Sequence, residues 1–266
     1  MADDQPKVKL HWLNGSRAQG TLWLLEQLEI PYELEIYHRD KSMLAPAELA
    51  KLHPLGKSPV VTITPPGASE PIVLAESAFI VEYMCEHSAN GKELVPKRWK
   101  DGQEGKIGGE TEEWMRYQYI MYYSEGSFMS QLVVYFVISG LKGGRVPFFI
   151  RPISRAIANQ VISQFSFPNL QKHFTLLESY LSTSPGGEYL CGNHLTGADI
   201  MLAFPLITGL GGSFDELGHW EKGSFAATFP KLWAYMQRLE KEPGWVKSVE
   251  KIREIEGSFS LLPGRD

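Results

Sequence analysis

Five residues in two short segments have the side chains and backbone needed to hold a small peptide. Lys57, Ser58 and Pro59 precede an apolar stretch, and Glu76 and Ser77 come directly after the next one, where a helical pattern begins. A carboxylate such as that of Glu76 pairs with an ammonium group, and the N–H groups at a helix N-terminus bind an anion. An extended backbone beside a proline can pair with a peptide. Together the two segments predict a backbone cradle with an anion site.

Ser16 carries a hydroxyl at the first junction between a strand-like and a helical stretch. It follows the first strand-like stretch and precedes the first helical one, and Asn14 lies two positions before it. From its position alone Ser16 is an ordinary helix N-cap.

The cysteines and histidines predict neither a metal centre nor dithiol chemistry. Cys85 and Cys191 lie 106 positions apart, with no second cysteine at metal-ligand or CxxC spacing. The histidines form no HxxxH or HExxH pattern. We therefore expect two buried, inert cysteines and no bound metal.

Composition predicts a globular protein with one large domain or two small ones. Of the 266 residues, 43% are hydrophobic and 21% charged, and the formal net charge is -5. An acidic balance argues against nucleic acid or an anionic membrane as the main partner, because phosphate binding draws on clustered Lys and Arg. The longest apolar run, 132–138, is too short to span a bilayer, and the first residues are unlike a signal peptide. We expect a cytoplasmic protein without an integral membrane segment.

Residues 1–92 follow the order of a thioredoxin-like α/β domain. Apolar patterns predict strands at 8–13, 32–37, 60–64 and 72–74, and helices at 16–28, 45–52 and 77–87. A Pro-rich turn, 65–71, joins the last two strands. Because no GxGxxG follows the first strand, we do not expect a dinucleotide site.

Residues 93–109 are predicted to be a linker and residues 110–266 an all-α domain. The linker is rich in Pro, Lys, Arg and Gly. Helical spacing then predicts helices at 113–139, 153–165, 169–182, 197–210, 229–240 and 246–255. The stretch 140–168 contains an irregular insertion around Pro147 and Pro152, to which the sequence assigns no role.

A capping motif marks the start of the predicted helix 197–210. We expect Thr196 to be the N-cap, Asp199 to reach back to it from the third helical position, and Leu195 to pack against Ile200. The acidic side chain also suits the positive end of a helix. Losing Thr196 or Asp199 is expected to cost about 0.5–2 kcal/mol of stability.

In this order the segments resemble the glutathione transferases. The resemblance rests on the thioredoxin-like first domain, on Gly56-Lys57-Ser58-Pro59 where the family has its cis-proline loop, on Glu76-Ser77 where it binds the γ-glutamyl end, and on the capping motif at Thr196. Segments 11–13, 16–18 and 22–25 look most like the microbial and fungal cytosolic branch, which carries a serine at the end of the first strand. The implied architecture is an α/β thioredoxin-like N-terminal domain followed by an all-α C-terminal domain.

By this resemblance the ligand is glutathione, bound as a co-substrate. Ser16 is the catalytic residue and donates a hydrogen bond to its thiolate, a role compatible with capping the helix, while Asn14 or a backbone amide of the same loop is the alternative donor. Lys57 meets the glycine or cysteinyl end. The backbone of Ser58 pairs with the cysteinyl residue. Glu76 takes the α-amino group, and Ser77 takes the γ-glutamyl carboxylate. The first loop has no cysteine, which speaks against the branch that works through thiol–disulfide exchange.

The activity implied is addition of the glutathione thiolate to hydrophobic electrophiles, carried out by a homodimer. Candidates for the electrophile site are Met115, Tyr119 and Tyr123, which share a helix face. The same residues would also suit an ordinary core or a dimer interface. A second activity, peroxidase reduction of organic hydroperoxides, stays open. The alternative hypothesis is a protein of this fold that binds glutathione and hydrophobic ligands without turnover.

Overall fold

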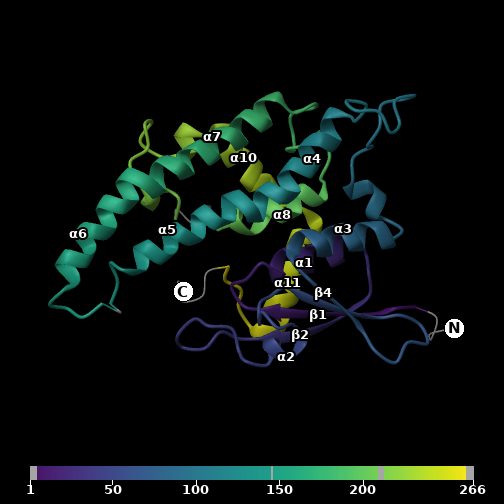
Figure 1. The fold of residues 1–266 in the computed structure, drawn as a ribbon, viewed down its shortest axis with the longest axis horizontal. Helices are drawn as coiled ribbons and strands as arrows, with labels where there is room; N and C mark the ends of the chain where they lie inside the picture. Colours follow the sequence, from purple (N-terminus) through teal and green to yellow (C-terminus); the bar gives the residue numbers. More distant parts are fainter. Residues whose placement is uncertain (1–4, 145, 209–212, 262–266) are drawn as a thin grey trace. The chain divides into compact units, whose positions relative to one another are not determined.

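Two compact units make up the chain, and each contains segments that are distant in sequence. The computed structural model describes residues 5–144, 146–208 and 213–261. The first unit comprises Met1–Lys97, Leu195–Phe204 and Arg238–Asp266, and the second comprises Arg98–His194 and Pro205–Gln237. The helices and strands are labelled in Figure 1.

The first unit is built on a mixed four-stranded sheet. Its strands are β1 (Lys7–Leu13), β2 (Tyr32–Tyr37), β3 (Val60–Thr64) and β4 (Ile72–Ala75), in the spatial order β2-β1-β3-β4. β1 runs parallel to β2 and antiparallel to β3, and β3 runs antiparallel to β4. All four predicted strands are confirmed. Val8 and Leu10 of β1 are buried, whereas Lys7 is exposed. This alternation is expected for a strand with one apolar face.

Helices α1 (Ala18–Gln27) and α3 (Ser77–His87) are confirmed within the first unit, but the helix predicted over 45–52 is much shorter. α2 covers only Leu49–Leu52. Before it, the backbone N–H of Leu49 donates to the carbonyl of Pro46, and that of Ala50 donates to the carbonyl of Ala47. These bonds span three residues and form tight turns, so the segment enters the α-helix late.

The C-terminal helix α11 (Pro243–Glu256) packs on α1 inside the first unit. Gln19 Nε2 donates to Ser248 Oγ at 2.9 Å, and the rings of Trp23 and Trp245 meet edge to face with centroids 5.7 Å apart. Gly244 is required here, because a Cβ at this position would lie 2.6 Å from the Trp23 ring. The first unit therefore includes a helix that the sequence placed in the all-α domain of residues 110–266, and the predicted boundaries at 92 and 109 remain predictions.

The second unit is helical, and all the described strands lie in the first. Its helices are α4 (Glu112–Tyr123), α5 (Ser130–Gly140), α6 (Arg151–Val161), α7 (Phe167–Thr183), α9 (Phe225–Thr228) and most of α10 (Pro230–Leu239), while α8 (Gly197–Ile207) begins in the first unit. The helix predicted over 113–139 passes through a π-helical turn, Ser124–Met129, and a second such turn, Ile162–Ser166, joins α6 to α7. Residues 209–210 of the predicted helix 197–210 lie outside the described residues.

The reach-back contact of the capping motif is formed as predicted. The backbone N–H of Thr196 donates to Asp199 Oδ2 at 2.8 Å, so the carboxylate reaches back as expected. The Thr196 hydroxyl also donates to the same oxygen at 2.7 Å. A carboxylate is a stronger acceptor than a hydroxyl, and it draws both donors of Thr196. Both residues are fully buried, and the contact between Leu195 and Ile200 stays a prediction.

Three further observations bear on possible function. Cys85 and Cys191 are both buried, as predicted. Across residues 5–144, 146–208 and 213–261, no three His, Cys, Asp or Glu side chains gather as metal ligands would. Within the same ranges, no helix is both long enough and apolar enough to cross a membrane.

Candidate functional site

Strand register brings the predicted peptide-binding segments to one end of the sheet. His11 of β1 is opposite Val60 of β3, and Val60 is also opposite Ala75 of β4. At this end of the sheet the chain leaves β1 toward Ser16, enters β3 after residues 57–59 and leaves β4 at residues 76–77, and β2 also ends here, since Tyr37 is opposite Leu13. These segments are distant in sequence, and it is the register of the paired strands that brings them to the same end of the sheet.

Two hydroxyl groups meet at this end. Ser16 Oγ lies 3.4 Å from Ser58 Oγ, and both side chains are buried. Ser16 Oγ donates to the carbonyl of Leu13 at 2.7 Å and accepts from the backbone N–H of Ala18 at 3.2 Å. Ser58 Oγ donates to the carbonyl of His11 at 3.3 Å. Ser16 lies one residue before the N-cap of α1, Arg17, and its hydroxyl takes the N–H of the first helical residue while it stands beside Ser58.

Arg39 holds the loop between β1 and α1, and the sequence analysis missed it. Its Nε and Nη2 donate to the carbonyls of Asn14 and Gly15 at 3.1 and 3.2 Å, and its backbone N–H donates to Asn14 Oδ1 at 2.8 Å. Burial, followed by the charge of Arg17, lowers the pKa of Arg39. The side-chain oxygen of Asn14 is thus already engaged. No sequence signal identifies Arg39, because its partners are mainly backbone carbonyls.

The second segment presents a helix N-terminus. Ser77 is the first residue of α3 and is buried, while Glu76 before it is exposed and has φ 71°. No side chain caps this helix end at Glu76. A residue with a side chain is unusual at positive φ, and such strain is commonly found at ligand sites. The first N–H groups of α3 are therefore suitable for binding an anion.

The cradle segment lies next to the two hydroxyls. The Ser58–Pro59 peptide is cis, as the resemblance implies, and Pro59 is buried while Lys57 is exposed. Because the β1–β3 ladder ends at the pair of His11 and Val60, Ser58 lies just beyond the strand pairing. Its backbone is positioned where an added peptide could continue the ladder.

A buried histidine lies under this end of the sheet. His11 is 3% exposed, and its Nε2 lies 3.1 Å from Thr62 Oγ1 while its Nδ1 lies 3.3 Å from the Tyr37 hydroxyl. Tyr37 donates to Glu35 at 2.7 Å, and His11 Nδ1 is 3.5 Å from the other Glu35 oxygen. Burial lowers the pKa of His11, Glu35 raises it, and Lys9 lowers it, with a net lowering.

In the helical unit, the predicted electrophile-site residues differ in accessibility. Met115 is 55% and Tyr119 45% exposed, whereas Tyr123 is 5% exposed. The rings of Tyr119 and Tyr123 stack with centroids 5.5 Å apart, and the Tyr123 hydroxyl lies 2.8 Å from His173 Nδ1. The side chains of Met115 and Tyr119 are therefore accessible to a ligand, and the buried ring of Tyr123 packs against that of Tyr119.

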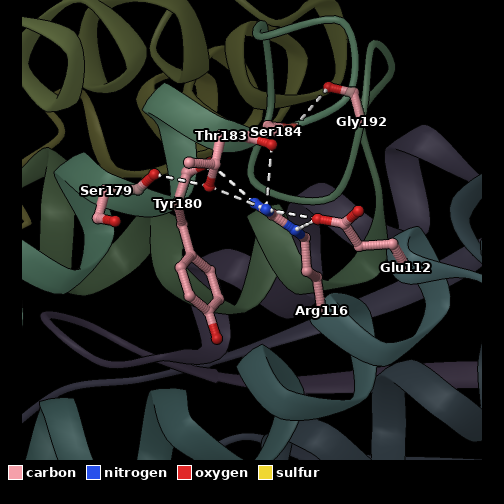
Figure 2. A network of polar contacts seen from close by, with 7 residues as sticks. All are labelled: Glu112, Arg116, Ser179, Tyr180, Thr183, Ser184 and Gly192. Carbon is pink, nitrogen blue, oxygen red and sulfur yellow. Dashed lines mark hydrogen bonds and ion pairs between the residues drawn. The ribbon is translucent and has the colours of Figure 1, made fainter.

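Arg116 holds the helix that carries these residues. Figure 2 shows its guanidinium between the acceptors of α7 and the carboxylate of Glu112. Nη1 donates to the carbonyl of Tyr180 at 2.9 Å, Nη2 donates to the carbonyl and hydroxyl oxygens of Thr183 at 3.0 and 2.9 Å, and both Nε and Nη2 donate to Glu112 Oε1. Arg116 thereby satisfies carbonyls left open at the end of α7. The Tyr180 ring in turn lies 5.7 Å from that of Tyr119, centroid to centroid.

The structure thus assembles the predicted residues in two groups. Within the first unit, register brings Ser16, Ser58 and the Glu76–Ser77 pair to the same end of the sheet. Within the second unit, Met115 and Tyr119 share one exposed helix face. The arginines that hold the two groups, Arg39 and Arg116, were not predicted.

Comparisons with known proteins match both halves of the chain to one family. Residues 15–87 match the family described as glutathione S-transferase, N-terminal domain, and residues 154–249 match its C-terminal domain. Glutathione S-transferase 1 of Saccharomyces cerevisiae is 30% identical over 254 residues, which cover 96% of this chain and 99% of the yeast protein.

Solved structures agree on the architecture. A glutathione S-transferase from Actinobacillus pleuropneumoniae superposes with a TM-score of 0.65 at 27% identity, covering 96% of this chain and 95% of the bacterial one. Ure2p5 from Phanerochaete chrysosporium, cocrystallized with 1-(S-glutathionyl)-2,4-dinitrobenzene, gives a TM-score of 0.64 at 17% identity and covers 96% of this chain and 99% of its own. The second comparison is evidence for the fold alone.

Proposed function

Because the chain belongs to the glutathione S-transferase family, we propose that it lowers the pKa of the glutathione thiol and conjugates the thiolate to hydrophobic electrophiles. The observation that carries this proposal is the strand register that brings Ser16, Ser58 and Glu76 to one end of the sheet. Glutathione has a group for each of them: its thiol for Ser16, the backbone of its central cysteinyl residue for Ser58, and its α-amino group for Glu76. The serine in the first loop supports placing the chain in the microbial and fungal branch.

The proposed binding mode uses each group for the chemistry it can perform. The Ser58 backbone, beyond the end of the β1–β3 ladder, pairs with the cysteinyl residue. The α3 N-terminus and the Ser77 hydroxyl bind the γ-glutamyl carboxylate. The exposed Glu76 carboxylate pairs with the α-amino group, and the exposed Lys57 meets the glycine or cysteinyl end.

Ser16 supplies the hydrogen bond to the sulfur. A thiol with a pKa of about 8.5 is only about 3% ionised at pH 7, and lowering that pKa by about two units requires about 2.7 kcal/mol of selective stabilisation. A hydrogen bond to a charged group supplies about 1.5–3 kcal/mol. A nearby helix N-terminus adds about 0.3–1 kcal/mol. These contributions are sufficient for the proposed shift.

Ionisation alone accelerates the reaction little. The gain in thiolate is largely offset, because thiolate nucleophilicity falls as the pKa falls, with a slope of about 0.4–0.5 for thiol exchange. Most of the rate enhancement must then come from holding the sulfur and the electrophile together. We assign the electrophile contact to Met115 and Tyr119, which are exposed, with the buried Tyr123 as a supporting ring.

A second candidate function is glutathione binding without turnover. One observation favours it: the Ser16 proton is already donated to the Leu13 carbonyl at 2.7 Å. To donate to the thiolate, the Ser16 hydroxyl must rotate its proton away from that carbonyl. The N–H of Ala18 can continue to donate to the Ser16 oxygen. If this rotation is too costly, the site binds the peptide and leaves its thiol unactivated.

Turnover measurements separate the two candidates. We expect wild type to conjugate glutathione to 1-chloro-2,4-dinitrobenzene, and Ser16→Ala to lose most of this rate while still binding glutathione. Cumene hydroperoxide, assayed in parallel, tests the proposed peroxidase activity, and sedimentation of the purified protein tests the proposed homodimer. Glutathione binding without a measurable wild-type rate on either substrate would support the second candidate.

A further inference from the structure

The helical hairpin formed by α5 and α6 carries positive charge that the acidic composition of the chain conceals. Between Glu125 and Glu178 the sequence has no Asp or Glu, and it has five Lys or Arg: Lys142, Arg145, Arg151, Arg155 and Lys172. Since the whole chain has a formal net charge of -5, the remaining residues together carry -10. The acidic balance of the whole chain therefore does not exclude an anionic surface as a partner of this hairpin.

The turn between α5 and α6 exposes large apolar side chains. Phe148 and Phe149 are 79% and 69% exposed, and their rings lie edge to face, 5.6 Å apart between centroids. Ile150, directly before α6, and Ile153 and Ile157 on α6 continue the apolar surface, each at least 43% exposed. The spacing of these three isoleucines places them on one side of the helix.

This apolar stripe is separate from the side of α6 that packs into the protein. Ala158 and Ile162, which are 0% and 7% exposed, face inward. The stripe lies about 130° around the helix from these two residues, since each residue advances the helix by about 100°. α6 therefore has one apolar side for the core and another without a partner among the described residues. A continuous apolar surface of this kind is uncommon on a soluble monomer unless it binds something.

Three cationic residues, Lys142, Arg151 and Arg155, flank the same turn. Arg151 donates to the carbonyls of Gly144 and Val146, and Arg155 Nε donates to the carbonyl of Lys142 at 3.1 Å. These bonds are to neutral backbone groups, so the arginines hold the turn in place and keep their charge. Aromatic and basic side chains thus lie together at the end of the hairpin, which Figure 1 shows as the far ends of α5 and α6.

We propose that the α5–α6 turn docks the protein on an anionic lipid surface. Phe148, Phe149 and Ile153 enter the boundary between headgroups and acyl chains, while Lys142, Arg151 and Arg155 contact the headgroups. An amphipathic helix that combines aromatic or aliphatic residues with Lys and Arg binds membranes in this way without crossing them. The protein would remain peripheral.

Charge favours a lipid surface over a second copy of the chain. A two-fold dimer brings the same patch of both subunits together. Contact through this turn would place the three cations of one subunit near those of the other, with no carboxylate in the segment to compensate. An anionic surface instead complements the charge and covers the apolar side chains.

Vesicle sedimentation tests the proposal with the full chain. We expect wild type to bind phosphatidylcholine vesicles that contain about one third phosphatidylserine, to bind pure phosphatidylcholine much less, and to lose binding as sodium chloride rises. Phe148→Ser combined with Phe149→Ser should weaken binding by tenfold or more. Arg151→Gln combined with Arg155→Gln should weaken it by about fivefold per charge removed.

Matched variants control for folding and for unspecific effects. Ile107→Ser removes a fully exposed apolar side chain outside the hairpin and should leave vesicle binding unchanged. Arg155→Lys keeps the charge and should retain most of the binding. Thermal unfolding of every variant confirms that it is folded, and none of these readouts requires glutathione or enzyme activity.

Three results would overturn the proposal. The first is a wild type that binds neither kind of vesicle. The second is equal vesicle binding by wild type and the double phenylalanine variant. The third is that neither protein binds vesicles and that the double phenylalanine variant sediments with a smaller mass than wild type. That result would assign this face to a second copy of the chain.

Discussion

The hydroxyl oxygens of Ser16 and Ser58 lie 3.4 Å apart, and each donates to a backbone carbonyl of β1. Ser16 donates to Leu13 at 2.7 Å, and Ser58 donates to His11 at the longer distance of 3.3 Å. The longer bond is the weaker one. Of the two hydroxyl protons, that of Ser58 is therefore the easier to redirect to a bound thiolate or to the oxygen of Ser16.

Ser58→Ala is expected to raise the pKa of bound glutathione. A hydroxyl that donates to the thiolate, or supports Ser16 in doing so, is worth about 0.5–1.5 kcal/mol, which corresponds to about 0.4–1.1 pKa units. The backbone contact to the cysteinyl residue is kept in this variant, so glutathione affinity at high pH should change little. Thiolate absorbance of bound glutathione, followed against pH, gives both quantities.

The double variant Ser16→Ala/Ser58→Ala tests whether the two hydroxyls act together. Neighbouring groups that share one ligand show non-additive effects on free energy. We expect the pKa shift of the double variant to be smaller than the sum of the single shifts. Additive shifts would show that the two hydroxyls act independently.

Glu76→Gln is expected to weaken glutathione binding by roughly tenfold, which is about 1.4 kcal/mol. The amide keeps the shape of the side chain but loses the charge that pairs with the α-amino group. Isothermal calorimetry measures the affinity. Glu70→Gln removes an equally exposed charge from the turn before β4 and should leave the affinity unchanged. Equal affinity of Glu76→Gln and wild type would remove this carboxylate from the site.

The buried His11 should make the folded state sensitive to acid. Its pKa is lowered from the ordinary 6.5, chiefly by burial, and the groups facing it are Tyr37, Glu35, Thr62 and Lys9. Between the folded and the unfolded pKa values the unfolded chain binds more protons, so stability increases with pH. The contribution of His11 is fully present above about pH 6.5 and is lost as the pH falls through the window below it.

His11→Gln should therefore reduce the loss of stability on acidification. Urea midpoints at about pH 7.5 and about pH 5.5 measure that loss. The pKa of His173 is also lowered by burial, so the variant should reduce the acid sensitivity without abolishing it. His194→Gln, at an exposed position, is the matched control. A pH dependence identical to that of wild type would contradict this assignment.

Arg116→Met is expected to lower the free energy of unfolding by about 1–3 kcal/mol. The change leaves the carbonyls of Tyr180 and Thr183 without their guanidinium donors. Arg116→Lys should recover only part of the loss, because one ammonium cannot reproduce the planar fork of donors. Urea unfolding measures the effect, and Lys172→Met on α7 controls for removal of an exposed cation. If Arg116→Met lowers the free energy of unfolding no more than Lys172→Met does, the hydrogen bonds of Arg116 contribute nothing to stability.

Local patterns were sufficient to predict most elements of the first unit, and to select the residues that the structure brings to one end of its sheet. The four strands, α1 and α3 follow from apolar periodicity and from Pro and Gly breaks. Ser16, Ser58 and Glu76 could be identified because each adjoins the end of a predicted element, where ligand groups gather. Convergence at one end of the sheet then follows from strand pairing.

Features that depend on tertiary packing could not be predicted in this way. Arg39 and Arg116 act on backbone carbonyls, which every residue has, so no partner residue type reveals them. Tyr123 lies one helical turn from Tyr119, yet it is buried because its hydroxyl meets His173 of α7. The return of α11 to the first unit depends on the fit of Gly244 against Trp23. Periodicity in the sequence contains none of this information.

The pH titration of glutathione bound to wild type and to Ser16→Ala decides whether the Ser16 hydroxyl lowers the pKa of the thiol. With wild type we expect thiolate absorbance at neutral pH, because the thiol pKa falls by about two units from its usual value of about 8.5. With Ser16→Ala we expect the titration to return most of the way toward that value while glutathione stays bound. Identical titrations of the two proteins, or a wild type that binds no glutathione, would contradict the account.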